Sequence, residues 1–237
     1  MKTILITGTT QGIGEVLYNH LKDKYNVVTV NRREFRGNNY VCDLSNLNQV
    51  IKLCKIMKNK KIDILINNAG GASPSRIKDL SIDELSNVTN LNYHAPVLLM
   101  QAVIDNMANK GYGRIINISS IASKSPRQYI PHYGAAKASL ESFSKSIAVA
   151  YSNYGITVNC LCLGGVNTKT SHDNRRLMAS IDDKDEDFYN KKIESENGLN
   201  RLISPDEIVA YVDFLLSDDA KSISGQTINV CGVKEVH

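Results

Sequence analysis

The chain has 237 residues, of which 42% are hydrophobic and 22% charged, and its formal net charge at pH 7 is +4. This length and composition allow a buried core without disulfides or metals, and the basic residues form no long run, so no nucleic-acid partner is indicated. The five cysteines and five histidines lack disulfide-like or metal-ligand spacing, so we expect no bound metal. No apolar stretch approaches the ~20 residues of a membrane helix, so we expect no membrane association and a cytoplasmic location.

Strand-like apolar segments alternate with helical patterns along the chain. The expected elements are, in order, a strand at 3–7, a helix beginning near Ile13, strands at 26–30 and 39–42, a helix at 47–57, a strand at 62–66, a helix at 82–107 broken near Pro96, a strand at 114–118, a helix at 132–151, a strand at 156–162, a helix at 205–217 and a strand at 227–230.

This alternation predicts an α/β fold: a single Rossmann-type, doubly wound parallel sheet of about seven strands flanked by helices, in one domain over residues 1–237. The second and third strands are separated by only about eight residues, Asn31 to Asn38, so a crossover helix is missing or reduced there. The polar segment 167–200 differs in composition from the rest, and we interpret it as a lid-like insertion over the substrate.

A glycine-rich loop joins the first strand to the first helix. Gly8, Gly12 and Gly14 favour a tight turn, a close approach of the backbone to a pyrophosphate, and close packing of helix on strand. The N-terminus of the following helix offers unpaired N–H groups to the phosphates. The loop therefore predicts dinucleotide binding; the alternative is an ordinary strand–helix turn.

A tyrosine and a lysine lie four residues apart in the sequence YGAAK at 133–137, so in a helix Tyr133 and Lys137 project from the same side. A free tyrosine has a pKa near ~10, and an ammonium one turn away should lower that pKa, so that Tyr133 can exchange a proton with an alkoxide or alcohol. Such a pair alone is also common on amphipathic helices. Its context is Ser119 and Ser120, at the end of a strand that should face a ligand crevice.

The glycine spacing, the sequence NNAG at 67–70 and the YGAAK sequence together resemble the pattern of the short-chain dehydrogenase/reductase family, including its 3-oxoacyl-[acyl-carrier-protein]-reductase-like members. The resemblance covers the whole chain. It implies a catalytic group of Ser120, Tyr133, Lys137 and Asn90. Ser119 is the alternative to Ser120, and Asn92 is the alternative to Asn90, whose family role is to hold a water near the lysine.

The resemblance also implies a cofactor site. Its members bind the phosphates, the adenosine, the nicotinamide carboxamide or the nicotinamide ribose, and they are Gly8, Thr10, Gln11, Gly12, Ile13, Gly14, Asn31, Arg32, Arg33, Asp43, Leu44, Asn68, Ala69, Gly70, Tyr133, Lys137, Gly164, Val166 and Thr168. Leu163 departs from the family pattern, which has a proline before Gly164.

The end of the second strand bears on which dinucleotide binds. An acid there would pair with the ribose 2′-hydroxyl of NAD, whereas positive charge accommodates the 2′-phosphate of NADP. This chain has Asn31-Arg32-Arg33 and no acid before Glu34, so NADP(H) is expected in preference to NAD(H). Gln11 stands against this, because the position is often basic in NADP-using relatives.

The expected function is an oxidoreductase that transfers a hydride between a nicotinamide and a small-molecule carbonyl or secondary alcohol. One alternative is 3-oxoacyl-[acyl-carrier-protein] reductase, although Tyr112 and Tyr154 stand where relatives tend to carry docking arginines and Lys110 substitutes only in part. A non-catalytic dinucleotide sensor is the alternative of another class. Arg127 could meet an acidic substrate or be solvated. The resemblance implies a homotetramer or homodimer.

Overall fold

The computed structural model describes residues 1–234, and a seven-stranded parallel sheet lies at its centre. The strand order β3-β2-β1-β4-β5-β6-β7 reverses direction beside β1, as in doubly wound folds, and confirms the predicted fold class. The strands are β1 (Thr3–Thr7), β2 (Asn26–Asn31), β3 (Asn38–Val41), β4 (Ile64–Asn67), β5 (Gly113–Ser120), β6 (Ile156–Leu163) and β7 (Thr227–Val230).

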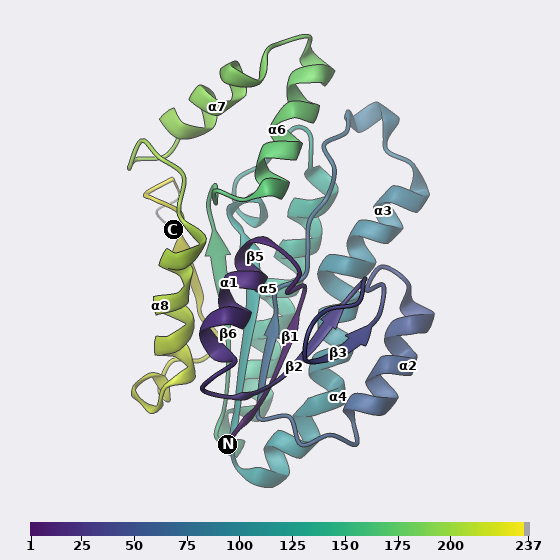
Figure 1. Ribbon diagram of the computed structural model, residues 1–237, viewed down its shortest axis with the longest axis vertical. Helices are drawn as coiled ribbons and strands as arrows, with labels where there is room; N and C mark the ends of the chain where they lie inside the picture. The colour runs from purple at the N-terminus through teal and green to yellow at the C-terminus, as the bar shows by residue number, and fades with distance from the viewer. Residues whose placement is uncertain (235–237) are drawn as a thin grey trace.

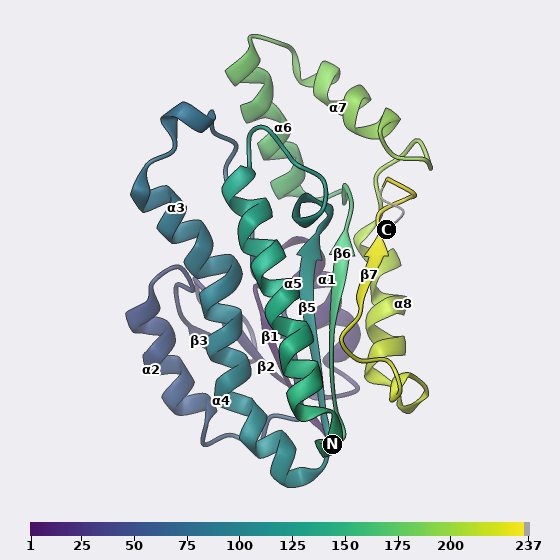
Figure 2. The same cartoon turned by 180° about the vertical axis from the view of Figure 1, so that it is seen from behind.

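Helices cover both faces of the sheet. Helices α1 (Gly12–Leu21) and α8 (Pro205–Leu216) lie on the face seen in Figure 1. Helices α2 (Leu47–Met57), α4 (Ala95–Lys110) and α5 (Pro131–Tyr151) cover the opposite face, with α3 (Ile82–Thr89) packed against α5 (Figure 2).

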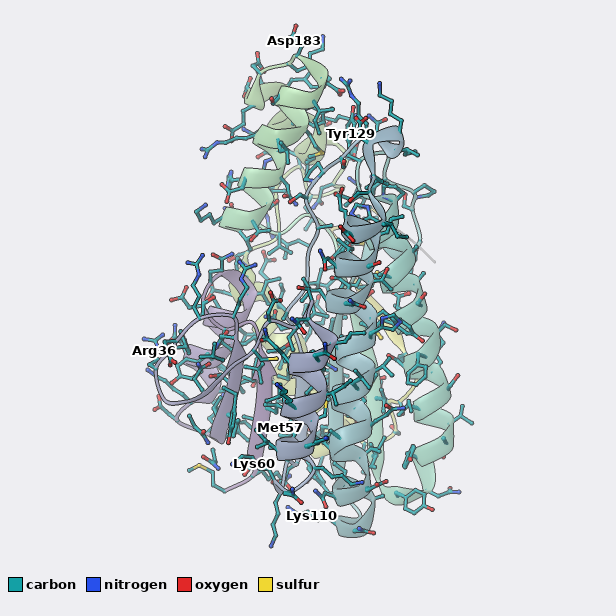
Figure 3. All side chains as sticks on the ribbon, turned by 90° about the vertical axis from the view of Figure 1, so that its right-hand side faces the viewer. Arg36, Met57, Lys60, Lys110, Tyr129 and Asp183 are labelled. Carbon is teal, nitrogen blue, oxygen red and sulfur yellow. The ribbon has the colours of Figure 1, made fainter. Side chains whose placement is uncertain are left out.

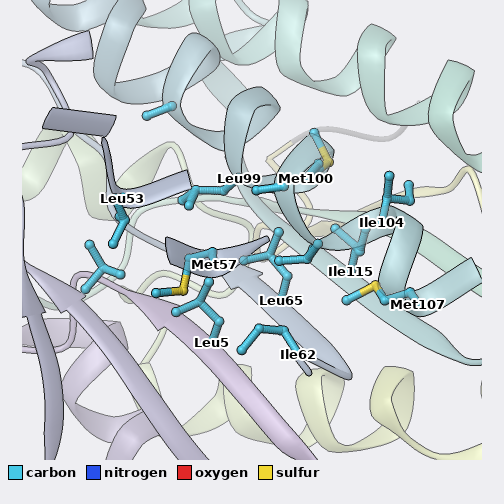
Figure 4. Close-up of a cluster of buried hydrophobic side chains, with 14 of the residues drawn as sticks. Leu5, Leu53, Met57, Ile62, Leu65, Leu99, Met100, Ile104, Met107 and Ile115 are labelled. Carbon is cyan, nitrogen blue, oxygen red and sulfur yellow. The ribbon is translucent and has the colours of Figure 1, made fainter. Parts of the chain in front are cut away.

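The alternation of side chains along β1 divides the core into two layers. Ile4 and Ile6 point toward α1 and α8, whereas Leu5 points toward α2 and α4. Figure 4 shows Leu5 among the strand residues and helix residues of this second layer, where Met57 and Leu99 are fully buried. Near-continuous apolar strands are required here because both faces of a parallel sheet are covered.

The helix predicted over 82–107 is interrupted before Pro96, not at it. A π-helical turn at Asn90–His94 separates α3 from α4, and Pro96 lies in the first turn of α4. Proline has no backbone N–H, and the first turn of a helix does not need one. For the same reason Pro96 cannot donate a hydrogen bond to the carbonyl of Asn92, four residues earlier. The π-helical turn therefore falls on the residues that precede Pro96.

The segment 167–200 forms two helices, α6 (Lys169–Asp182) and α7 (Glu186–Ser195), which lie beyond the carboxyl ends of the strands at the top of Figure 1. The Asp182 carboxylate accepts hydrogen bonds from the Tyr129 and Tyr189 hydroxyls. Figure 3 shows Tyr129 and Asp183 at one end of the molecule, opposite Lys60 and Lys110. Within residues 1–234, no helix has the length and apolarity needed to cross a bilayer.

Candidate active site

A cleft of about 820 Å³ opens at the carboxyl ends of the strands. Every residue that the sequence assigned to the cofactor site lines this cleft, and so do Ser120, Tyr133 and Lys137, whereas Asn90 does not. The lining residues that the sequence did not single out are mainly backbone neighbours of these, together with Thr170, Ser171 and Asn174 from α6. No cluster of three or more metal-ligating side chains occurs in the described part of the chain.

The glycine-rich loop is held by close backbone contacts. A Cβ on Gly14 would lie 1.9 Å from the Gly8 carbonyl oxygen, so only glycine fits at the start of α1. Asn68 Nδ2 donates to the carbonyl oxygens of Thr7 and Gly8, both at 2.9 Å. Gln11 stands at the N-cap of α1 without a side-chain capping bond, so the N–H groups of the first turn face the cleft as a ready anion site.

Asn31, at the end of β2, supports this loop from behind. It is only 3% exposed, its Oδ1 accepts a 2.7 Å hydrogen bond from Thr9 N, and its Nδ2 donates to Thr9 Oγ1 at 2.9 Å and to Asn39 Oδ1 at 2.8 Å. Its amide is therefore occupied by the protein. The exposed side chains at this corner of the cleft are Arg32, Arg33 and Glu34, and neither arginine is ion-paired with a carboxylate among residues 1–234.

Asp43 and Thr168 also line the cleft. Asp43 Oδ1 accepts hydrogen bonds from the backbone and hydroxyl of Ser45, which fixes its carboxylate beside buried Leu44. Thr168 caps α6 by accepting from Ser171 N at 3.2 Å. A Cβ on Gly12 would lie 3.4 Å from Thr168 Cγ2, so α6 begins directly across from the phosphate loop.

The catalytic group predicted from the sequence is assembled by the contact between β5 and α5. Ser120 and Tyr133 both line the cleft, and the Ser120 hydroxyl lies near enough to the phenol to lower the pKa of Tyr133. Ser120 Oγ also accepts a hydrogen bond from Ala122 N at 3.2 Å. A Cβ on Gly134 would lie 2.4 Å from the Ala122 carbonyl oxygen, so the glycine after Tyr133 lets α5 approach the serine turn. Lys137 Nζ lies 5.6 Å from the centre of the Tyr133 ring.

The acidity of Tyr133 differs from the prediction. Burial raises the pKa of Tyr133 to about 12, and the Ser120 hydroxyl offsets this only in part. Lys137 does not produce the expected lowering, because its ammonium donates a 2.7 Å hydrogen bond to the Ile118 carbonyl oxygen and is not bonded to the phenol. Burial also lowers the pKa of Lys137 to about 8. Desolvation thus dominates both groups.

The structure brings Asn92, not Asn90, to this group. A Cβ on Gly70 would lie 2.7 Å from Asn92 Oδ1 and 3.0 Å from Lys137 Nζ, so the two side chains meet at that glycine. Asn92 is fully buried in the π-helical turn and also bonds Gly71 N and O, each at 2.9 Å. Asn90 Nδ2 instead donates to the Ser45 carbonyl oxygen. The distance to Ser120 along the chain misled the choice because it ignores the π-helical turn.

Sequence reasoning missed one further buried polar group beside the site. Glu141 is only 8% exposed and accepts hydrogen bonds from Ser119 Oγ at 2.5 Å and Ser123 Oγ at 2.7 Å. Its signal in the sequence was its spacing, because it follows Lys137 by four residues on the stripe of α5 that faces the sheet.

The fold and this site together define a nucleotide-binding α/β oxidoreductase of the Rossmann type. More specifically, the chain belongs to the short chain dehydrogenase family, whose model matches residues 2–178.

The chain is 32% identical to the 3-oxoacyl-[acyl-carrier-protein] reductase of Buchnera aphidicola, over 98% of this chain and 96% of that protein. Among solved structures, it is similar to a short chain dehydrogenase family protein of Francisella tularensis, with a TM-score of 0.87, 26% identity and 98% of both chains covered. It is also similar to an actinorhodin polyketide ketoreductase with NADPH, with a TM-score of 0.88, 25% identity and coverage of 98% and 96%.

Proposed function

We propose that this protein is an NADP(H)-dependent reductase of a small-molecule ketone or aldehyde, with Tyr133 as the general acid. The observation that carries this proposal is the grouping of Ser120, Tyr133 and Lys137 on the wall of a cleft that the glycine-rich loop also lines, with Lys137 Nζ 5.6 Å from the centre of the Tyr133 ring. A nicotinamide in that cleft would supply the hydride.

The direction of reaction is inferred from the protonation of Tyr133. Because its pKa is raised to about 12, the phenol keeps its proton at neutral pH and is suited to donating it to the alkoxide that forms as a carbonyl is reduced. Ser120 would orient the carbonyl oxygen. The Lys137 ammonium would return a proton to Tyr133 through solvent, and Asn92, which meets Lys137 at Gly70, would hold a water for that transfer.

The residues present fit a phosphorylated dinucleotide. The uncapped N-terminus of α1 suits the pyrophosphate, and the exposed guanidinium groups of Arg32 and Arg33 suit a ribose 2′-phosphate. Val166 and Thr168 would hold the carboxamide, as the family resemblance implies. Helices α6 and α7 would act as the lid over the substrate, held by Asp182 at Tyr129.

3-Oxoacyl-[acyl-carrier-protein] reductase is a second candidate, favoured by the full-length similarity to the enzyme from Buchnera aphidicola. The surface argues against it. Lys110, the partial substitute for a docking arginine, is ion-paired with Asp63, and Arg127 is paired with Glu196 at 3.5 Å rather than presented to an acidic substrate. A free ketone is therefore the preferred substrate class.

The test is NADPH oxidation by the purified protein with a panel of ketones, aldehydes and acyl thioesters, followed by absorbance. We expect Tyr133→Phe to abolish turnover while NADPH still binds in calorimetry. If no carbonyl in the panel gives turnover that depends on Tyr133, the non-catalytic sensor becomes the better account. Light scattering tests the predicted homotetramer or homodimer.

A further inference from the structure

Glu141 is an ionisable group buried beside the catalytic residues that the reaction described above does not use. A buried carboxylate is costly unless it is hydrogen-bonded, and Glu141 Oε1 receives two hydroxyls, one from Ser119 and one from Ser123. These two serines bracket Ser120, which lines the cleft together with Tyr133. Glu141 is thus joined on both sides to the turn that presents the substrate-binding serine.

We propose that Glu141 is a positioning residue for the proposed reduction: it holds the turn of Ser119 to Ser123 so that Ser120 faces Tyr133, and its negative charge stabilises the Lys137 ammonium. The inference rests on the proposed function and names a residue that acts through Ser120 and Lys137 rather than by touching substrate.

The positioning half of the proposal follows from the side-chain hydrogen bonds that join the turn to α5. Ser123 Oγ lies 2.7 Å from both Glu141 Oε1 and the Ser120 carbonyl oxygen, and Ser119 Oγ lies 2.5 Å from the same Glu141 oxygen. One carboxylate oxygen therefore ties the backbone before and after Ser120 to α5, the helix that carries Tyr133. A displacement of the serine by ~1 Å can lower a rate about 100-fold, so these restraints matter.

The electrostatic half follows from position and charge. Glu141 lies one helical turn after Lys137. Burial is the largest effect on Lys137 and lowers its pKa, whereas Cys160 and then Glu141 raise it. The other ionisable groups that face this pair are Lys145 on α5, Lys124 after β5, Tyr133 on α5, Cys160 and Cys162 on β6, and Cys231 after β7. Burial raises the pKa of the Cys160 thiol to about 11 and that of the Cys162 thiol to about 12, so both thiols are neutral at pH 8 and Glu141 supplies the compensating charge.

Two substitutions separate the two halves. Glu141→Gln keeps an oxygen for the serine hydroxyls and removes the charge; Ser123→Ala removes one restraint and keeps the charge. For Glu141→Gln we expect the alkaline limb of the kcat profile for carbonyl reduction to move to lower pH by roughly 1 unit, with KM and NADPH affinity unchanged. For Ser123→Ala we expect kcat to fall about fivefold, with the alkaline limb of its pH profile at the same pH as in the parent. Asp23→Asn, which removes an exposed carboxylate after α1, is the matched control and should change neither.

The inference is overturned if Glu141→Gln leaves the alkaline limb within 0.2 unit (roughly the error of such a fit) or if Ser123→Ala leaves kcat unchanged. If Glu141→Gln does not fold, as judged by circular dichroism, Glu141→Asp replaces it; the shorter carboxylate keeps the charge, so kcat should fall while the limb stays. Failure of the proposed function looks different, because Tyr133→Phe would then keep its turnover whatever the Glu141 variants do.

Discussion

Replacing Asn31 with alanine should both destabilise the protein and weaken dinucleotide binding. Thr9 is fully buried, and Asn31 is the partner of its backbone N–H and of its hydroxyl. The third partner, Asn39 Oδ1, keeps a hydrogen bond from Thr29 Oγ1 and is not orphaned. Two buried polar groups thus lose their partners, at about 1–2 kcal/mol each, in the lower part of the range for an unsatisfied buried group, so we expect a loss of about 2–4 kcal/mol in unfolding free energy.

For a chain of this length, each kcal/mol lowers the melting temperature by roughly 2–4 °C, so calorimetry should show a decrease of about 5–15 °C for Asn31→Ala. Asn31→Asp is the matched control, because it keeps an oxygen for Thr9 N–H and should lose less. NADPH titration should show weaker binding to Asn31→Ala, since Thr9 belongs to the phosphate loop. A variant that melts within 2 °C of the parent (about 1 kcal/mol or less) and binds NADPH normally would refute this account of Asn31.

Three further outcomes are expected. Arg32→Asp should lower the affinity for NADPH relative to NADH at least about tenfold, measured by calorimetric titration of both; an unchanged ratio removes Arg32 from the 2′-phosphate site. Gly134→Ala places a Cβ 2.4 Å from the Ala122 carbonyl oxygen, so kcat should fall about 100-fold while NADPH still binds, and a kcat within twofold of the parent would contradict the close contact. The kcat for reduction should decline as pH rises through about 8, because the lowered pKa of Lys137 means that its ammonium is lost there while Tyr133 stays protonated; a profile flat to pH 10 would contradict this.

Much of the fold could be predicted because local pattern and tertiary environment agree. The apolar runs that become β1 and β6 are buried on both faces, and the predicted boundaries of α2 and β7 match those of the structure. The short connection between β2 and β3 contains no helix, as its length indicated. The segment 167–200 is mostly polar, so its hydrophobic periodicity did not predict the two helices that form there. The helices α6 and α7 there depend on caps at Thr168 and Asp185 and on tertiary contacts such as that of Tyr129 with Asp182.

The candidate site was predictable where residue type and spacing suffice, as for the glycine-rich loop and for Tyr133 with Lys137. It was not predictable where packing decides. Asn90 and Asn92 are two residues apart in similar surroundings, and only the π-helical turn decides which of them reaches Gly70. Asn31 was assigned to the cofactor site and lines the cleft, but the sequence did not indicate that its amide holds Thr9, since a buried amide takes the partners that the fold supplies.

The protonation of the site is the point at which sequence spacing failed most clearly, and the failure constrains the chemistry. A lysine one turn from a tyrosine suggested a phenolate, but desolvation acts on both groups and moves their pKa values in opposite directions, favouring the neutral form of each. The phenol therefore holds its proton until a negative oxygen develops beside it, and Lys137, whose pKa lies close to physiological pH, can give up and regain a proton readily. In the proposed reaction, that combination would favour proton donation to an alkoxide over proton removal from an alcohol. Glu141, the one buried carboxylate bonded to the serine turn among residues 1–234, is a charged group that opposes the effect of burial on Lys137 and so favours its ammonium form.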